Sequence, residues 1–286
     1  MFRGILAAQQ PPFPARARPR AICEETLSAG HARSGRGIKR ALCVSIGGVA
    51  LALSLEDEKL FARAEKRYSA FADGVGIGRP VNVVPDCAGN GSEAVFASDF
   101  ESARVLVSAK GVEFRGVKNE YALDSLMRMF LSWELLSRNG FLLHAASVVR
   151  NGRAYIFVGK SGAGKSTVAS LSPAGSVLTD EISLLLKNNG EWRAFGTPFW
   201  GEFHAAGSNM SAPVAGVFHL VKAREIRTRP LRGASLLRAL LPNILFFSSK
   251  TQDHQRLLEI AGAASEEIPG HTLEFRRNRK FWEVLP

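Results

Sequence analysis

Gly159-Lys160-Ser161-Gly162-Ala163-Gly164-Lys165-Ser166 fits the pattern G-x-x-x-x-G-K-[ST] of the phosphate-binding P-loop and is the strongest indication of the fold in this sequence. In a P-loop the backbone N–H groups point inward and surround the phosphates of a nucleotide, and glycines let the backbone approach without a Cβ. Lys165 is then expected to contact the β- and γ-phosphates, and the hydroxyl of Ser166 to ligate Mg²⁺. The stretch therefore predicts a site for a nucleotide such as ATP, formed by the loop from Gly159 to Ser166.

The flanking residues favour this prediction over a glycine-rich turn that carries a stray lysine. Residues 154–158 form a β-prone apolar run that leads straight into the loop, and residues 167–171 can continue as a helix. Strand, loop and helix in that order are the context that a P-loop requires. Upstream, Asn151-Gly152 separates residues 142–149 from this strand, and the dipeptide is typical of a type I′ hairpin turn. We therefore expect a β-hairpin whose second arm runs into the loop.

The chain is basic, but its charge is unevenly distributed. Of the net charge of +11 over 286 residues, residues 1–40 carry +6, from eight Lys or Arg against two Asp or Glu. Their composition cannot bury enough apolar surface to offset the entropy of ordering, so we expect a disordered basic tail. A nucleic-acid-binding or membrane-surface arm is the alternative for this segment. The remaining +5 does not indicate that the folded part binds nucleic acid.

The sequence contains no apolar run near the ~20 residues that a membrane span requires, and its apolar start is short for a signal peptide. We therefore expect a cytoplasmic protein without a membrane partner. A homo-oligomer stays open.

The rest of the chain predicts two folded parts. Residues 41–118 combine short β-prone runs with one helical stretch, 56–71, and predict a small N-terminal α+β part. Asn119 is a favourable N-cap and Gly140 a favourable stop for a helix, and apolar residues cover nearly every side between them, as in a buried helix. Residues 119–286 then form a P-loop domain, with a mixed β-sheet flanked by helices. The predicted fold class is α/β.

Two carboxylates and a histidine are candidate partners of the loop. Asp180-Glu181 follows the apolar run 177–179, fourteen residues after the loop, where a strand can deliver both side chains to the phosphates. One can accept the proton of an acceptor hydroxyl while the other faces the metal ion; a solvated acidic turn is the alternative. His144 precedes the loop by fifteen residues, and a core histidine without a catalytic role is its alternative.

Leu143-His144-Ala145, the loop, and Thr179-Asp180-Glu181 together resemble the HPr kinase/phosphorylase family. That family has a His-small pair, a hairpin, a G-x-S-G-x-G-K-S loop and an Ala-Asp-Asp strand end, and it shares its P-loop type with phosphoenolpyruvate carboxykinases. The resemblance covers about residues 120–222, and the later Glu-x-x-x-Gly-Arg-Asn signature is missing. It implies a carboxykinase-like core with Asp180 as catalytic acid/base and His144 near the phosphates. It also implies that Ser166 and Thr167 contact Mg²⁺ and the phosphates. Glu181 stands where the family has its second Asp, and the resemblance implies that it lies near the metal.

The function implied by the resemblance is an ATP- and Mg²⁺-dependent kinase that phosphorylates a serine of a protein or peptide. Lys165 and the loop amides would neutralise the phosphates while Asp180 accepts the hydroxyl proton during in-line transfer. A nucleotide-binding regulator without turnover and a small-molecule kinase of the same fold stay open. Residues 196–203 contain aromatic side chains that can hold an acceptor, with Glu202 near it; a packed core loop is the alternative.

Overall fold

The computed structural model describes residues 40–72, 78–85, 94–173, 175–199 and 207–286. Except for Arg40, the predicted tail lies outside these residues, and so do Glu202 and its neighbours in 200–206. The division of the chain at 118 and 119 stays a prediction. Within the described ranges, no helix is long and apolar enough to cross a membrane.

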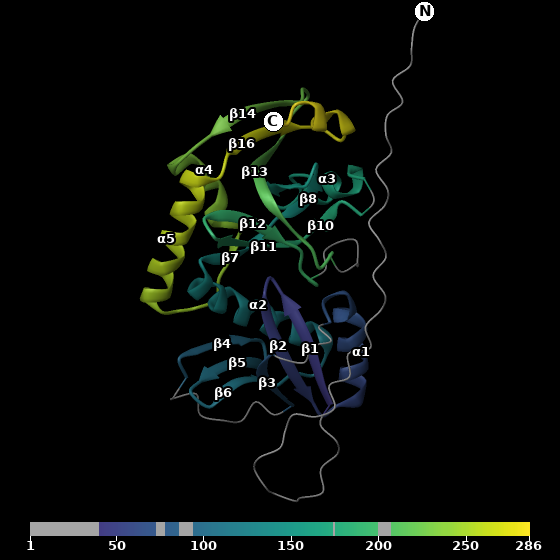
Figure 1. Ribbon diagram of the computed structural model, residues 1–286, viewed down its shortest axis with the longest axis vertical. Helices are drawn as coiled ribbons and strands as arrows, with labels where there is room; N and C mark the ends of the chain where they lie inside the picture. The colour runs from purple at the N-terminus through teal and green to yellow at the C-terminus, as the bar shows by residue number, and fades with distance from the viewer. Residues whose placement is uncertain (1–39, 73–77, 86–93, 174, 200–206) are drawn as a thin grey trace, which may run out of the picture.

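The fold is α/β, with two mixed β-sheets that lie on either side of helix α2 (Figure 1). The first sheet contains β1 (Arg40–Ile46), β2 (Val49–Leu55), β3 (Arg79–Val84), β4 (Phe96–Phe100), β5 (Ala103–Ser108) and β6 (Gly111–Arg115). Its order is β1-β2-β3-β6-β5-β4, with β3 parallel to both of its neighbours. Helix α1 (Glu58–Tyr68) covers it; the helix is shorter than the predicted 56–71 because Asp57 caps its start and Ser69–Phe71 tightens into a 3-10 turn.

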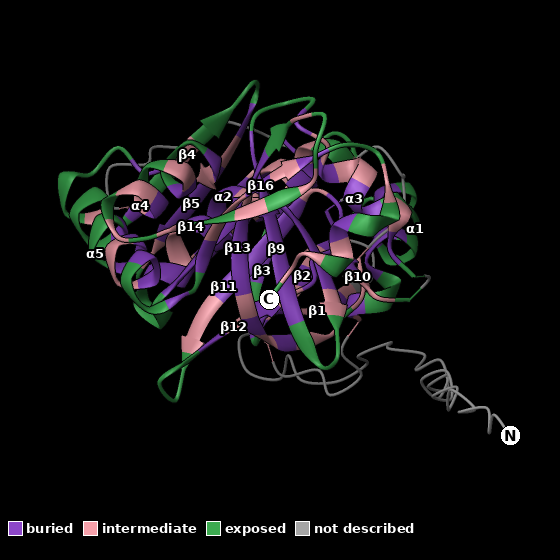
Figure 2. Ribbon diagram, turned by 90° about the horizontal axis from the view of Figure 1, so that it is seen from above, coloured by how far each residue is buried: buried purple, intermediate pink, exposed green. Residues whose placement is uncertain are grey.

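The second sheet follows the order β10-β8-β9-β13-β12-β11-β7-β15, and β16 pairs with both β13 and β14. Its strands are β7 (Gly140–His144), β8 (Ala146–Arg150), β9 (Arg153–Val158), β10 (Val177–Thr179), β11 (Ile182–Asn188), β12 (Glu191–Phe195), β13 (Ser211–Lys222), β14 (Arg227–Leu231), β15 (Ile244–Leu245) and β16 (Gly270–Phe275). Helix α3 (Lys165–Leu171) lies on one side of this half, and α4 (Ala234–Leu240) and α5 (Thr251–Glu267) lie on the other (Figure 1). Buried residues are concentrated in the central strands (Figure 2).

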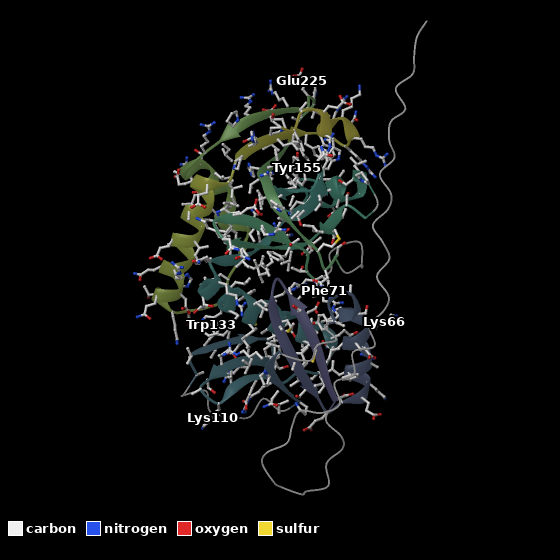
Figure 3. The ribbon with its side chains drawn as sticks, viewed as in Figure 1. Lys66, Phe71, Lys110, Trp133, Tyr155 and Glu225 are labelled. Atoms are coloured by element: carbon white, nitrogen blue, oxygen red, sulfur yellow. The ribbon has the colours of Figure 1, made fainter. Side chains whose placement is uncertain are left out.

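Helix α2 (Glu120–Glu134) is buried between the two sheets, as its all-round apolar pattern predicts. Asn119 caps it, accepting from the N–H groups of Tyr121 and Ala122. Its buried side chains share one hydrophobic core with the first sheet and with Leu142 and Ile182 of the second. Figure 3 shows Trp133, near the end of α2, at the level where the two halves meet.

The α-helix itself ends at Glu134, but helical turns continue to Arg138, close to the predicted stop at Gly140. After α2 the chain tightens into a 3-10 turn at Leu135–Arg138, and Asn139 adopts the left-handed conformation, with φ of 57°. Gly140 instead begins β7, where a Cβ would lie 2.7 Å from the carbonyl oxygen of Leu185. The glycine therefore serves close strand packing rather than helix termination.

The predicted hairpin is present, but its first arm is not one strand. Asn151 and Gly152 have φ of 51° and 74°, as a type I′ turn requires. The expected arm 142–149 breaks at Ala145, because β7 pairs with β11 whereas β8 pairs with β9. Because of this break, the end of β7 lies beside the start of β11, while β8 continues alongside β9, the strand that leads into the glycine-rich loop.

Candidate functional site

The loop occupies the turn between β9 and α3. Gly159, Gly162 and Gly164 have φ of 154°, 73° and 114°, a region that side-chain-bearing residues rarely adopt. At Gly164 a Cβ would also lie 2.9 Å from the ring of Phe275. Glycine is thus required here by backbone conformation and by packing, which is why the local sequence folds as a curled loop.

Lys165, the first residue of α3, is held inside this loop. Its side chain is 7% exposed, and its ammonium Nζ donates to the carbonyl oxygen of Gly159 at 2.8 Å. The N–H of Ala163 donates to the carbonyl oxygen of Lys160 at 3.0 Å and narrows the turn further. The lysine charge therefore stands within the ring of backbone that is expected to surround phosphate.

Two strand-to-strand crossings place His144 and Glu181 together. The chain passes from β7 to β8 at Ala145, and from β10 to β11 at Asp180-Glu181. The crossings touch, since the N–H of Ala145 donates to the carbonyl oxygen of Glu181 at 3.0 Å. His144 Nε2 consequently lies 3.7 Å from Glu181 Oε1, beyond hydrogen-bond length.

One cavity of about 300 Å³ joins the loop to these two side chains. Its lining residues are His144, Ser161, Gly162, Gly164, Lys165, Ser166, Thr167 and Glu181. The volume is at the low end of the range for small-molecule sites. Three predicted site residues do not line it: Gly159 accepts the Lys165 hydrogen bond, and Ala163 and Asp180 are each 5% exposed. The predicted roles of all these residues stay predictions.

Electrostatics in the cavity disfavour a charged histidine. Burial lowers the pKa of His144 below its ordinary 6.5, and the charge of Lys165 lowers it further. Glu181 opposes this effect, while Arg128 adds to it. His144 is therefore neutral at pH 7 and can offer one donor and one acceptor nitrogen.

Arg128 is a charged residue near the site that the sequence prediction missed. It lies on α2 between buried methionines, and its guanidinium carbon stands 5.0 Å from the ring centre of Phe199. Among the described residues its Nε is buried without a hydrogen-bond partner. The sequence offers only an arginine between two methionines as a signal, and its importance depends on the position of α2 between the sheets.

A second cavity of about 300 Å³ shares three loop residues with the first, namely Gly162, Gly164 and Thr167. Its remaining lining residues are Ala163, Lys222, Ala223, Phe275, Arg276 and Arg277. It therefore lies along the same loop and combines an aromatic ring with three cationic side chains. The basic turn after β16 therefore lies beside the loop from Gly159 to Ser166.

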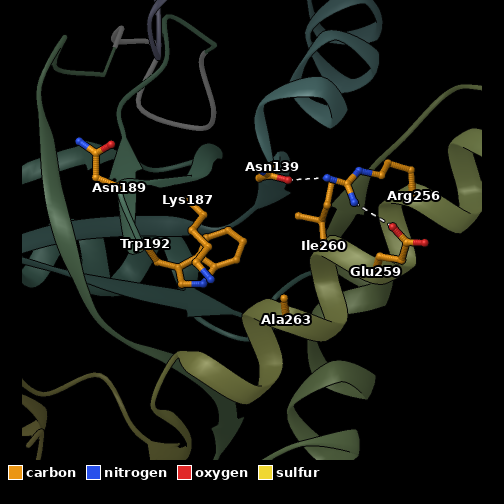
Figure 4. A pocket seen from close by; sticks show the side chains of 9 residues that line it. Asn139, Lys187, Asn189, Trp192, Arg256, Glu259, Ile260 and Ala263 are labelled. Carbon is orange, nitrogen blue, oxygen red and sulfur yellow. Dashed lines mark hydrogen bonds and ion pairs between the residues drawn. The ribbon is translucent and has the colours of Figure 1, made fainter.

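A cavity of about 360 Å³ between the β11–β12 turn and α5 contains none of the predicted site residues (Figure 4). Arg256 spans it, donating to Asn139 and, at 2.8 Å, to Glu259. The arginine that spans this cavity is thus already paired with two of its other lining residues.

The residues at the loop suit Mg²⁺ bound together with a nucleotide. Mg²⁺ takes oxygen ligands and is usually held by one or two carboxylates together with substrate phosphates and water. Ser166 supplies a hydroxyl and Glu181 a carboxylate to the same cavity. Across the described ranges, no three His, Cys, Asp or Glu side chains form a metal-binding cluster.

The model of a family described as SynChlorMet cassette protein ScmC matches residues 122–285, more than half of the chain. No curated protein matches it. Matching solved structures include the HPr(Ser) kinase/phosphatase from Coxiella burnetii, with 13% identity over 43% of this chain and 87% of that one, at a TM-score of 0.24. Membership of the HPr kinase family stays a prediction.

Proposed function

We propose that this chain, which belongs to the SynChlorMet cassette protein ScmC family, is an ATP- and Mg²⁺-dependent kinase that phosphorylates a serine hydroxyl of a protein or peptide. The observation that supports this best is the single cavity lined by Lys165, Ser166, His144 and Glu181. It combines a buried cation, a hydroxyl and a carboxylate around a loop of exposed backbone. Those are the groups that stabilise a nucleotide's terminal phosphates and the charge of phosphoryl transfer.

In the proposed reaction the serine hydroxyl oxygen attacks the γ-phosphorus of ATP. The bond from this phosphorus to the β–γ bridging oxygen breaks, ADP leaves, and Asp180 accepts the hydroxyl proton. Lys165 exchanges the carbonyl of Gly159 for phosphate oxygens. Mg²⁺, held by Ser166 and Glu181, would supply further charge neutralisation when bound.

The nucleoside is proposed to occupy the second cavity at the loop. A nucleotide bound with its terminal phosphates beside Lys165 extends along the shared residues Gly162, Gly164 and Thr167. Phe275 then offers a ring near the base, and Lys222 and Arg276 offer charge near the α-phosphate. Both ends of the nucleotide are thereby accommodated on one loop.

A nucleotide-binding regulator is the alternative that one observation favours. Asp180, the proposed base, is 5% exposed and does not line the cavity, whereas a base must reach the acceptor proton. The kinase proposal therefore requires that Asp180 becomes accessible when nucleotide and acceptor bind.

Transfer from γ-labelled ATP distinguishes the two functions. The chain is incubated with Mg²⁺ and serine-containing peptides, above all those encoded beside its gene, and the label is followed by mass spectrometry. A kinase labels a serine, and Asp180→Asn binds ATP normally but loses transfer by about 10²-fold or more. Asp99→Asn, an exposed carboxylate of the first sheet, is the control. ATP binding without transfer to any peptide or to water would favour the regulator.

A further inference from the structure

Helix α2 covers the face of the sheet from which His144 projects. Leu142 and Ile182 belong to the same hydrophobic core as α2. Alternate residues of a strand share a face, so His144 projects on the side of Leu142; it also stands opposite Ile182 in the pairing of β7 with β11. Side chains of α2 can therefore reach the cavity that His144 lines.

Arg128 is the cationic residue of α2, and a series of contacts connects it to residues beside that cavity. Its guanidinium lies over Phe199, two residues after Thr197, whose hydroxyl donates to the carbonyl oxygen of Ile182 at 2.6 Å. Ile182 directly follows Glu181. The charge of Arg128 acts on both Glu181 and His144, in keeping with this placement.

Among the described residues, Arg128 has no anionic partner within hydrogen-bond length. The nearest carboxylate among them is that of Asp124, with its Oδ2 at 3.9 Å from Arg128 Nη2. Asp124 is already engaged by α1, since its Oδ2 accepts from Arg67 Nε at 2.8 Å and its Oδ1 accepts from the hydroxyl of Tyr68 at 2.5 Å. A half-buried guanidinium with a buried, unpaired Nε is unfavourable unless something else pairs with it.

We propose that Arg128 binds the terminal phosphoryl group in the phosphoryl-transfer site, an inference that rests on the proposed kinase function. An anion in the adjoining cavity supplies the partner that the guanidinium lacks. The planar fork of arginine suits two phosphate oxygens at once. Asp124 ties α1 to α2 through Arg67 and Tyr68, so its carboxylate is shared with α1.

The test compares Mg·ADP with Mg·AMPPNP, a non-hydrolysable triphosphate, by isothermal titration calorimetry. A residue that contacts the third phosphate affects only the triphosphate. We expect Arg128→Ala to weaken AMPPNP binding by roughly tenfold to a hundredfold, and ADP binding by less than about twofold. Arg63→Ala is the control, because the exposed Arg63 of α1 pairs with Glu120 of α2, the helix that carries Arg128. The affinities for both nucleotides are expected to stay unchanged in this variant.

Arg128→Lys keeps a positive charge beside Asp124 and decides the matter if the alanine variant does not fold. It lacks the fork and is expected to weaken AMPPNP binding alone, by less than the alanine change. Equal losses for both nucleotides, or no loss for AMPPNP, overturn the inference and leave Arg128 a packing partner of Phe199. Failure of the unmodified chain to bind Mg·ADP overturns the kinase proposal itself.

Discussion

Replacing Lys165 by methionine removes the charge of the loop with little change of shape. In the chain without nucleotide, two effects on stability oppose each other. Lys165 is 7% exposed, so removal of its buried charge relieves a desolvation penalty. The same change removes the 2.8 Å donor of the buried Gly159 carbonyl, which costs about 1–3 kcal/mol. We therefore expect Lys165→Met to shift the melting temperature little.

In the nucleotide complex the two effects no longer cancel. An ammonium that donates to phosphate makes a charge-assisted hydrogen bond worth about 1.5–3 kcal/mol, which corresponds to roughly 10- to 150-fold in Kd. Calorimetric titration with Mg·ATP should show this loss in Lys165→Met. Titration with AMP should show little change, because the lysine of a P-loop contacts the β- and γ-phosphates.

Lys160→Met is a matched control for this experiment. Lys160 belongs to the same loop but is exposed, so its replacement is expected to change the ATP affinity by no more than about threefold. ATP binding by folded Lys165→Met at the affinity of the unmodified chain would refute the reasoning. An equal loss in Lys160→Met would refute it too, since the effect would then be general electrostatics.

Three further changes test the surroundings of the loop. Gly164→Ala is expected to lower stability by about 1–3 kcal/mol in thermal denaturation and to weaken ATP binding, since φ is 114° and the Cβ would approach Phe275 at 2.9 Å. His144 is expected to titrate below 6.5 in an NMR experiment, and Lys165→Met to raise its pKa, because the lysine charge lowers it. With the folded pKa below the unfolded one, the stability that His144 contributes is lost as the pH falls below 6.5. Asp124→Ala is expected to cost about 3–5 kcal/mol in urea unfolding, because the buried Arg67 loses the carboxylate that accepts from its Nε.

The two predictions on stability, for Gly164 and Asp124, each have a control within the chain. In Gly152→Ala the added Cβ has no atom within 4 Å, so only the strain of a φ of 74° remains. The loss of stability should therefore be smaller than in Gly164→Ala. Glu120→Ala breaks an exposed pair and should cost at most about 1 kcal/mol. Losses at Asp124 or Gly164 no larger than those of their controls would contradict the packing argument. A titration of His144 at or above 6.5 would contradict the described electrostatics.

Features fixed by neighbouring residues could be predicted from the sequence. The hairpin turn follows from Asn151-Gly152, since both residues adopt positive φ readily, and the structure confirms it. The buried helix α2 follows from apolar side chains all round it, and the structure confirms this as well. The strand, loop and helix around Lys165 follow from a β-prone run and the glycines after it, three of which adopt positive φ in the structure.

Features fixed by distant segments could not be predicted in this way. The break at Ala145 arises because β7 and β8 find different partners, and no local signal separates their residues. The burial of Asp180 depends on how the β10–β11 crossing packs. Arg128 reads as an ordinary helix residue until α2 is known to lie across the sheet that carries His144.

In the proposed kinase, the cavity at the loop binds the terminal phosphates of a nucleotide. A crystal structure of the chain with Mg·AMPPNP tests it most directly. We predict the β- and γ-phosphates in the cavity lined by His144, Glu181 and Ser166, with Lys165 Nζ turned from the Gly159 carbonyl to their oxygens. Phosphates bound elsewhere, for example in the cavity of Figure 4, with the Lys165–Gly159 hydrogen bond intact, would contradict the claim.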